Sequence, residues 1–206
     1  EPENFVDPRD IGTDVDPNPY LPLIPGATWV YEGGDETITV TVTNQIIEIL
    51  GVPCVVVRDV VEEDGELIED TDDWFAQDLE GNVWYFGEIS FNFEDGQLAD
   101  IEGSWKAGVE GDKQGYLIKR FPVVGEVFRQ EFSLGNAEDM AEVESLSGSA
   151  QVPAAECVGD CLVTREYTPI EPDFYEYKYY APGIGMILEV DPETGERVEL
   201  VEHNLD

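Results

Sequence analysis

A chain of 206 residues with 42% hydrophobic and 11% aromatic side chains is long enough to bury about 70% of its unfolded surface, so we expect a globular protein. Its 47 acidic and 10 basic side chains give a net charge of -37, which excludes a nucleic-acid partner because phosphate binding needs clustered Lys and Arg. No apolar stretch approaches the roughly 18 residues of a transmembrane segment.

The excess of acid must destabilise the compact state by self-repulsion unless the surroundings relieve it. Two explanations stay open. Concentrated salt would screen the charges, since the Debye length falls to about 3 Å at 1 M, and the scarcity of lysine also fits a saline habitat. Alternatively, some carboxylates are grouped to bind Ca²⁺ or another hard cation, which prefers oxygen ligands.

The chain is expected to form one domain with an appended segment. Residues 1–20 are rich in proline and lack periodicity, which predicts an extended lead-in or tether, and residues 21–206 form a single β domain. A second interpretation is that residues 1–17 pair with the sheet edge of a neighbouring molecule and so form a homo-oligomer.

Short segments with strand patterning follow one another from residue 27 onward, and turn residues separate them. This spacing favours an all-β fold, a single antiparallel meander curled into a barrel or sandwich. Only residues 136–146 could form a short helix, and they could equally form a strand. The expected strands are 27–33, 36–44, 54–61, 82–88, 116–121, 126–134, 161–168, 174–180, 185–190 and 197–202.

Three tight turns allow the register of the central hairpins to be predicted. They are Asp64-Gly65, Leu79-Glu80-Gly81 and Asp95-Gly96. Continuing the pairing from each turn without interruption places four apolar side chains in one row on one face, and the three aromatic ones are the predicted ligand-binding residues. The row consists of Val55, Trp74, Phe86 and Trp105.

The same register places acids beside this aromatic row. Asp72 faces Glu88 and Asp59 faces Asp70, and such like-charge pairs cost stability unless they are solvated, protonated or bridged by a cation. Three interpretations follow: a solvated end of the sheet, a Ca²⁺ site formed by these four carboxylates, or the acidic mouth of a pocket lined by the aromatic side chains.

Two other features bear on the environment of the chain and on its charge. A disulfide between Cys54 and Cys161, with Cys157 free, is the first expectation, and a Cys157–Cys161 bridge is the alternative. In residues 175–180, alternation places Lys178 on the face opposite three tyrosines, where we expect it to pair with nearby glutamates.

Familiar catalytic motifs are absent. The single histidine, His203, lies near the end of the chain, and no G-x-S-x-G, HExxH or P-loop pattern occurs. Chemistry would have to rely on carboxylates alone, so a glycosidase-like hydrolase using Glu88 is the least favoured interpretation.

Two segments carry a resemblance. The opening "NPYLPLIPGATWVYEG" (18–33) and the closing "EYKYYAPGIG" (176–185) resemble an uncharacterised family of bacterial secreted proteins and lipoproteins with β-sheet domains. The resemblance implies an extracytoplasmic protein, secreted or lipid-anchored at the cell surface, and implies no activity. We therefore expect a non-enzymatic binding or surface protein adapted to high salt, with Ca²⁺ or another hard cation as the expected small partner.

Overall fold

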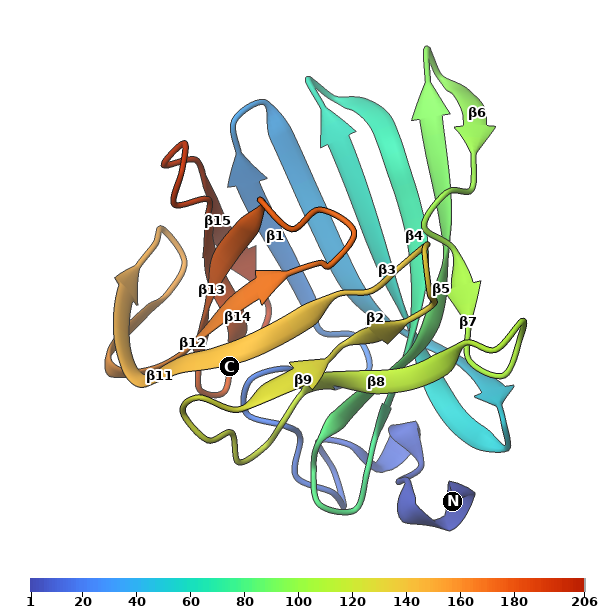
Figure 1. The fold of residues 1–206 in the computed structure, drawn as a ribbon. Coiled ribbons are helices and arrows are strands. Elements are labelled where there is room, and N and C mark those ends of the chain that lie inside the picture. Colours follow the sequence, from blue (N-terminus) through green and yellow to red (C-terminus); the bar gives the residue numbers. More distant parts are fainter. Residues whose placement is uncertain (206) are drawn as a thin grey trace.

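The computed structural model describes residues 1–205 and is built almost entirely of β-strands (Figure 1). Two short 3-10 turns come first, η1 (Pro2–Asn4) and η2 (Pro8–Asp10). The strands are β1 (Thr28–Gly33), β2 (Glu36–Ile49), β3 (Val52–Glu63), β4 (Glu66–Gln77), β5 (Val83–Glu94), β6 (Gln97–Asp100), β7 (Trp105–Lys106), β8 (Lys113–Ile118), β9 (Val127–Arg129), β10 (Glu131–Phe132), β11 (Met140–Gln151), β12 (Glu156–Tyr167), β13 (Tyr175–Ala181), β14 (Gly185–Val190) and β15 (Arg197–His203).

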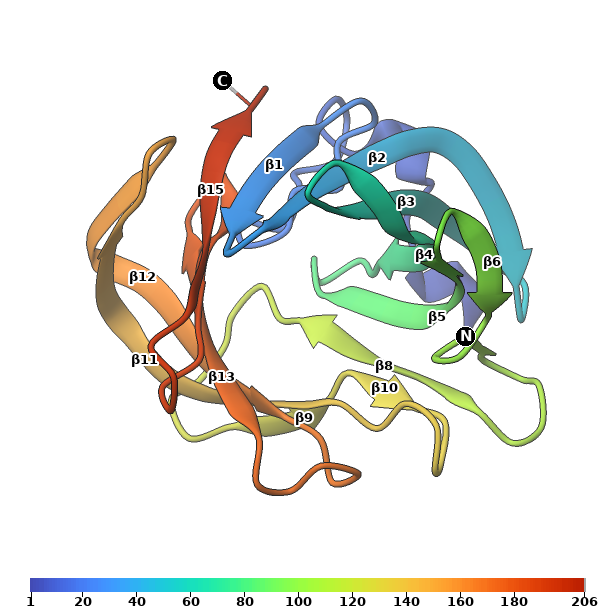
Figure 2. The ribbon, with the colours of Figure 1, turned by 90° about the horizontal axis from the view of Figure 1, so that it is seen from above.

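All of these strands belong to one antiparallel sheet, which confirms the predicted all-β meander. The order is β10-β8-β5-β4-β3-β2-β1-β15-β14-β13-β12-β11-β9, and β6 and β7 both pair with β5. Residues 136–146, which the sequence allowed as a helix or a strand, contain the start of β11, because residues from Met140 onward pair with β12. Viewed from above, the sheet curls into a nearly closed ring of strands (Figure 2).

One short segment, Val127–Phe132, joins the two ends of the sheet. Its first half is β9, which pairs with β11, and its second half is β10, which pairs with β8. Only Gln130 separates the two strands, and its side-chain amide donates to the Leu117 carbonyl at 3.2 Å. The chain therefore closes the barrel by using one extended segment as the edge partner of both end strands, which protects backbone groups that would otherwise be exposed.

Gly115 lies where the closing segment crosses β8. A Cβ atom there would come within 2.2 Å of the Gln130 carbonyl oxygen and 2.4 Å of the Arg129 carbonyl oxygen. We expect Gly115→Ala to lower the free energy of unfolding by about 1–3 kcal/mol, because backbone must move to admit the methyl group. Urea unfolding measures this loss, with Gln114→Ala on the same strand as the control. Equal stability of the two variants would contradict this account of closure.

The first twenty residues pack against the lower end of the barrel and are not a free tether (Figure 1). The Val6 amide donates to the Gln77 carbonyl at 3.0 Å, so the segment pairs with this chain's own sheet. The Phe5 ring lies edge-on to Phe86, with 5.6 Å between ring centroids. Asn18 is fully buried, and its amide donates to the Gly81 carbonyl at 2.8 Å. Residues 1–20 therefore cover the lower end of the barrel, and we call them the N-terminal cap.

The three predicted turns form as expected, but the register beyond them shifts. Pairing starts correctly at Glu63 with Glu66. A β-bulge then interrupts each hairpin: Ile68 of β4 is unpaired opposite β3, Phe86 and Gly87 of β5 lie opposite Trp74 of β4, and Ala99 of β6 is unpaired opposite β5. Each bulge adds one unpaired residue, and a shift of one residue turns a side chain to the opposite face.

The predicted aromatic row is therefore wrong. Val55 pairs with Phe75 in place of Trp74. Trp74 lies on the outer face, where the Lys106 ammonium stands 5.5 Å from its ring centroid. Phe86 is buried beneath the N-terminal cap, whereas Trp105 faces inward. The three rings thus contribute to different parts of the core and form no common ligand surface.

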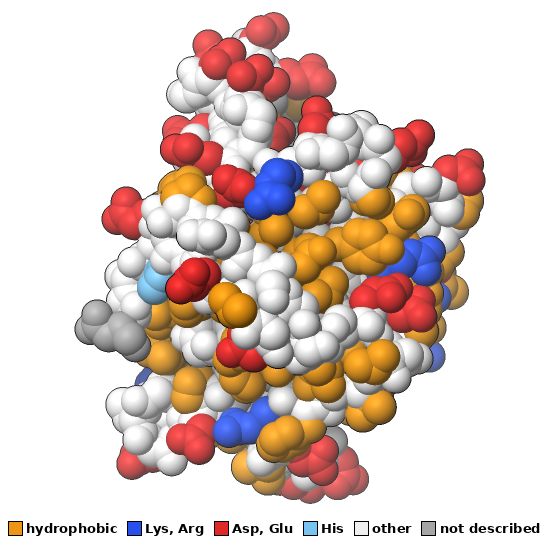
Figure 3. Space-filling view, turned by 90° about the vertical axis from the view of Figure 1, so that its left-hand side faces the viewer, with side chains coloured by type: hydrophobic (Ala, Val, Ile, Leu, Met, Phe, Trp, Pro, Cys, Tyr) orange, Lys and Arg blue, Asp and Glu red, His pale blue; other side chains and the backbone are white. Residues whose placement is uncertain are grey.

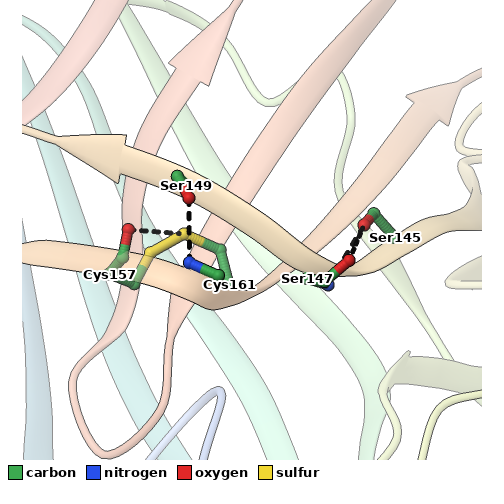
Figure 4. The surroundings of a disulfide bond; sticks show 6 residues. Ser145, Ser147, Ser149, Cys157 and Cys161 are labelled. Carbon is green, nitrogen blue, oxygen red and sulfur yellow. Dashed lines mark hydrogen bonds between the residues drawn. A yellow bond between two sulfur atoms is a disulfide. The ribbon is translucent and has the colours of Figure 1, made fainter.

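The disulfide joins Cys157 to Cys161, both in β12, so the expected Cys54–Cys161 bridge is not formed (Figure 4). Cys54 is completely buried in the core and has no disulfide partner. Ser149 on the neighbouring strand β11 accepts a hydrogen bond from the Gly159 amide at 2.8 Å, beside the bridge. The Cys157–Cys161 bridge, which the sequence left open as the alternative, is therefore the correct one.

Basic side chains are few, and each has a partner. Eight of the ten contact a carboxylate, and the remaining two, Lys106 and Lys113, lie over the rings of Trp74 and Phe132. On the side of the molecule shown in Figure 3, acidic side chains gather at the upper loop tips, and hydrophobic ones lie between the few bases in the middle. The surplus charge is therefore uncompensated acid.

Candidate functional site

The inner face of the barrel lines a cavity of about 270 Å³, which we call the central cavity. Alternation along the strands points every second side chain inward, so nine different strands contribute to its wall. Its apolar wall includes Tyr31, Ile38, Val40, Phe75, Leu117 and Met186. Its charged wall consists of Asp59, Asp73, Glu166, Lys178 and Glu189.

Lys178 is the only basic side chain that lines the central cavity. As expected from the sequence, its ammonium contacts glutamates: Glu176 at 2.9 Å, Glu166 at 3.3 Å and Glu189 at 3.4 Å. Burial opposes the charge on Lys178, but the three carboxylates outweigh it and hold its pKa well above the ordinary value. One ammonium group thus partly neutralises three buried or half-buried carboxylates.

Glu166 is held in place by neutral donors as well as by Lys178. The Thr164 hydroxyl donates to its Oε1 atom at 2.7 Å, and the Tyr180 hydroxyl donates to the same atom at 3.0 Å. β12 presents Thr164 and Glu166 on its inner face, and Tyr180 comes from the paired strand β13. Lys178, also from β13, extends this network to Glu189 of β14. The polar side of the cavity is therefore a connected network fixed by β12, β13 and β14.

Asp59 differs from these acids because one of its oxygens has no partner. Its Oδ1 atom is buried and accepts no hydrogen bond from residues 1–205. Burial, with a further contribution from Glu69 and partial opposition from Lys178, raises the pKa of Asp59 to about 7. A buried acceptor without a donor is costly, and native proteins rarely leave one unless a ligand or water satisfies it.

A second carboxyl cluster surrounds the Tyr85 hydroxyl, whose oxygen lies in hydrogen-bonding contact with both Asp73 and Glu88. Burial is the main cause that raises the pKa of both acids, and for Asp73 the charge of Glu88 adds to it. Glu131 accepts a hydrogen bond from the Trp105 indole at 3.2 Å. Burial, with Asp139 and Glu88 nearby, raises the pKa of Glu131 to about 8.

The two ends of the barrel differ. The lower end is closed by the N-terminal cap, and Leu21, which follows the cap, lines the central cavity. The upper end carries a depression of about 390 Å³ that shares Glu189 and Val198 with the central cavity, and we call it the mouth. The acids that line it are Asp35, Glu36, Glu63, Glu176, Glu189, Asp191 and Glu196, with Arg197 as its one base.

A larger depression of about 470 Å³ lies beside Phe5 and Trp84 at the lower end. Its buried acid, Asp78, already accepts hydrogen bonds from Asn82 and from the Trp84 indole at 2.8 Å. These contacts hold the structure of the 78–84 turn, and within residues 1–205 no buried side-chain atom that lines this depression lacks a hydrogen-bond partner. The central cavity is the stronger candidate site.

The four predicted cation ligands do not come together. Asp59 and Glu88 point inward, whereas Asp70 and Asp72 lie on the outer face, and Arg58 binds Asp70 through two bonds of 2.6 Å. No group of three or more His, Cys, Asp or Glu within residues 1–205 is arranged to hold a metal ion. The bulges bring Asp73 opposite Glu88, in the place expected for Asp72.

Sequence reasoning missed the inward positions of Asp73, Glu131 and Glu166. Glu131 lies between Gln130 and Phe132, and Glu166 lies between Arg165 and Tyr167, so apolar alternation does not mark either position as inward-facing. Asp73 also lacked a signal, since its orientation depends on a bulge at Ile68 that the local sequence does not announce.

Comparison with models of protein families, with curated proteins and with solved structures finds no match for this chain. Within residues 1–205, no helix combines the length and the apolar character needed to cross a bilayer. The geometry and charge of the central cavity are therefore the features that bear on the function of this chain.

Proposed function

We propose that this protein is a non-enzymatic, extracytoplasmic binding protein that holds a small organic molecule in the central cavity. The observation that carries the proposal is the Oδ1 atom of Asp59, a buried acceptor in the cavity region that no protein donor satisfies. A ligand with a suitable donor would remove the cost of leaving that acceptor unpaired.

The size and lining of the cavity fit a small ligand. A protein cavity of about 150 Å³ holds a benzene molecule, and ordinary ligand pockets begin near 300 Å³. At about 270 Å³, the central cavity would accommodate a bicyclic ring with a short polar arm. Apolar walls with a few fixed polar groups are the usual composition of such sites.

The carboxyl geometry favours binding over hydrolysis. Glycoside hydrolysis needs two carboxyl groups about 5–9.5 Å apart, which leaves room for the substrate or for a water molecule. Asp73 and Glu88 both contact the Tyr85 hydroxyl and are hydrogen-bonded to each other, so they are in close contact. Glu166 is occupied by Lys178 and two hydroxyl groups.

Two further features support an exported protein from a saline setting. The Cys157–Cys161 disulfide is of a kind that persists mainly in oxidising compartments outside the cytosol. The net charge of -37 is tolerable where salt screens it. The N-terminal cap, which pairs with Gln77 and Asp78 of this chain at the end of β4, gives no particular support to the assembly alternative.

Titration calorimetry in 2 M NaCl with three compounds that share an indole ring, namely indole, tryptamine and indole-3-acetate, tests the proposal. We expect saturable 1:1 binding of at least one compound. Val40→Trp would fill the cavity and weaken that binding at least tenfold, whereas Val158→Trp, at a position exposed on the outer surface, would leave it unchanged. Absence of binding by all three compounds at millimolar concentration would overturn the proposal.

A further inference from the structure

We infer that the ligand of the central cavity is an organic cation, a protonated amine on a short arm attached to an apolar body, whose ammonium group donates to the free oxygen of Asp59. This inference rests on the proposed function and specifies the chemical class of its ligand. It follows from three observations: the charge of the cavity wall, the surroundings of Asp59, and the composition of the mouth.

The cavity wall has more acids than its one base can neutralise. Four carboxyl groups line it, and Lys178 is the single cation. That cation already contacts three carboxylates, including Glu176, which lies outside the cavity lining. An anionic ligand would therefore find no available basic side chain, whereas a cationic one would supply charge that the wall lacks.

The groups around Asp59 come from several strands, and nearly all of them are acidic. β4 contributes Glu69 and Asp73, β5 contributes Glu88, and β14 contributes Glu189, while β13 contributes Lys178. The phenol of Tyr31 completes the set. A neutral hydroxyl group could satisfy the free oxygen, but only a charged donor would also offset the like-charge repulsion among these acids.

The mouth supports the inference as well, because it adjoins the cavity at Glu189 and Val198 and carries the same sign of charge. Seven carboxyl groups and one guanidinium line it, and that guanidinium, Arg197, already contacts Glu199 at 2.7 Å. A cleft lined by one sign of charge raises the local concentration of oppositely charged ligands and repels ligands of its own sign. A small cation would therefore be attracted both to the entrance and to the interior.

The three indole compounds test the inference, because they share a ring and differ in charge. We expect tryptamine to bind at least tenfold more tightly than indole, and indole-3-acetate not to bind. Asp59→Asn keeps the size of the side chain and removes its charge, so it should abolish the preference for tryptamine over indole. Asp72→Asn, the same substitution on the outer face, should change neither affinity.

A pH series provides a second measurement that does not depend on a variant. Asp59, with its raised pKa, ionises between pH 6 and 8, while an ordinary alkylamine stays protonated. Tryptamine affinity should therefore rise several-fold over this range, and indole affinity should stay constant.

The outcomes separate the two proposals. Equal affinities for all three compounds, or an Asp59→Asn variant with unchanged preference for tryptamine, would overturn the cation assignment and leave the binding function standing. Failure of every compound to bind would overturn the binding function itself.

Discussion

Lys178→Met is expected to lower the free energy of unfolding at pH 8 by about 3–5 kcal/mol, because removing one partner of a buried ion pair leaves uncompensated buried charge. The methionine keeps the length of the side chain but cannot neutralise Glu166, Glu176 and Glu189, which lie 2.9–3.4 Å from the ammonium. The loss should be smaller at pH 5, where carboxyl groups that have lost their cation can take up protons.

Urea unfolding in 2 M NaCl at pH 8 and pH 5 measures both effects. Lys106→Met is the matched control, since Lys106 is exposed on the outer face, where its ammonium lies over the Trp74 ring and makes no ion pair within residues 1–205. We expect that substitution to cost less than about 1 kcal/mol at either pH, as is usual for exposed cation–π contacts. Equal losses for the two variants would contradict the role assigned to the Lys178 network.

The second large effect is an increase in stability as the pH falls from 8 to 5. Asp59 and Glu131 have folded-state pKa values of about 7 and about 8, above the ordinary range of carboxyl groups, mainly because both are buried. Between the ordinary and the raised value, the folded state retains a proton that the unfolded state has released. The free energy of unfolding therefore decreases as the pH rises through this window and is recovered as it falls.

The size of this effect follows from the shifts. One pKa unit corresponds to about 1.4 kcal/mol, so each of the two groups accounts for at most about 4 kcal/mol. Asp73 and Glu88, whose pKa values are also raised, act in the same direction. At still lower pH the trend reverses, because acids whose pKa is lowered by hydrogen bonds, such as Asp191, lose that stabilisation when they are protonated. We expect maximal stability near pH 5.

Neutral variants show which groups are responsible. The double variant Asp59→Asn, Glu131→Gln should be more stable than the parent chain at pH 8 and close to it at pH 5, which flattens the pH profile. Glu94→Gln, at an exposed position on β5, should keep the parent profile. Urea unfolding at four pH values in 2 M NaCl makes the comparison, and a double variant with an unchanged profile would rule out these two acids as the cause.

Local chemistry specifies much of this fold. Strand alternation and turn residues predict the all-β meander, and the Asp-Gly turns adopt the expected left-handed backbone, with φ of 50° and 80° at Asp64 and Gly65. Alternation also places Lys178 inward beside glutamates, opposite the outward-facing tyrosines. These features depend on residues close in the chain, which the sequence displays directly.

The candidate site depends on contacts between distant residues. A bulge at Ile68 of β4 shifts its pairing with β3, so that Asp73 faces inward opposite Val57 and Trp74 faces outward, and no turn or spacing signals it. Burial by the N-terminal cap withdraws Phe86 from any ligand surface, although the proline-rich composition of the cap favours a tether. The choice of Cys157 as the partner of Cys161 likewise depends on where β3 and β12 lie in the barrel.

Closure of the sheet by Val127–Phe132 explains why such a charged interior exists. Only when β8 and β11 share that segment do acids from β3, β12 and β14 face one another across an enclosed space. Composition and alternation could establish an acid-rich β-sheet protein, because they depend only on which side chains are present and on how often they repeat along each strand. Which acids are buried together, and which oxygen is left without a donor, is set by strand register and closure, since both arise from packing across the whole barrel.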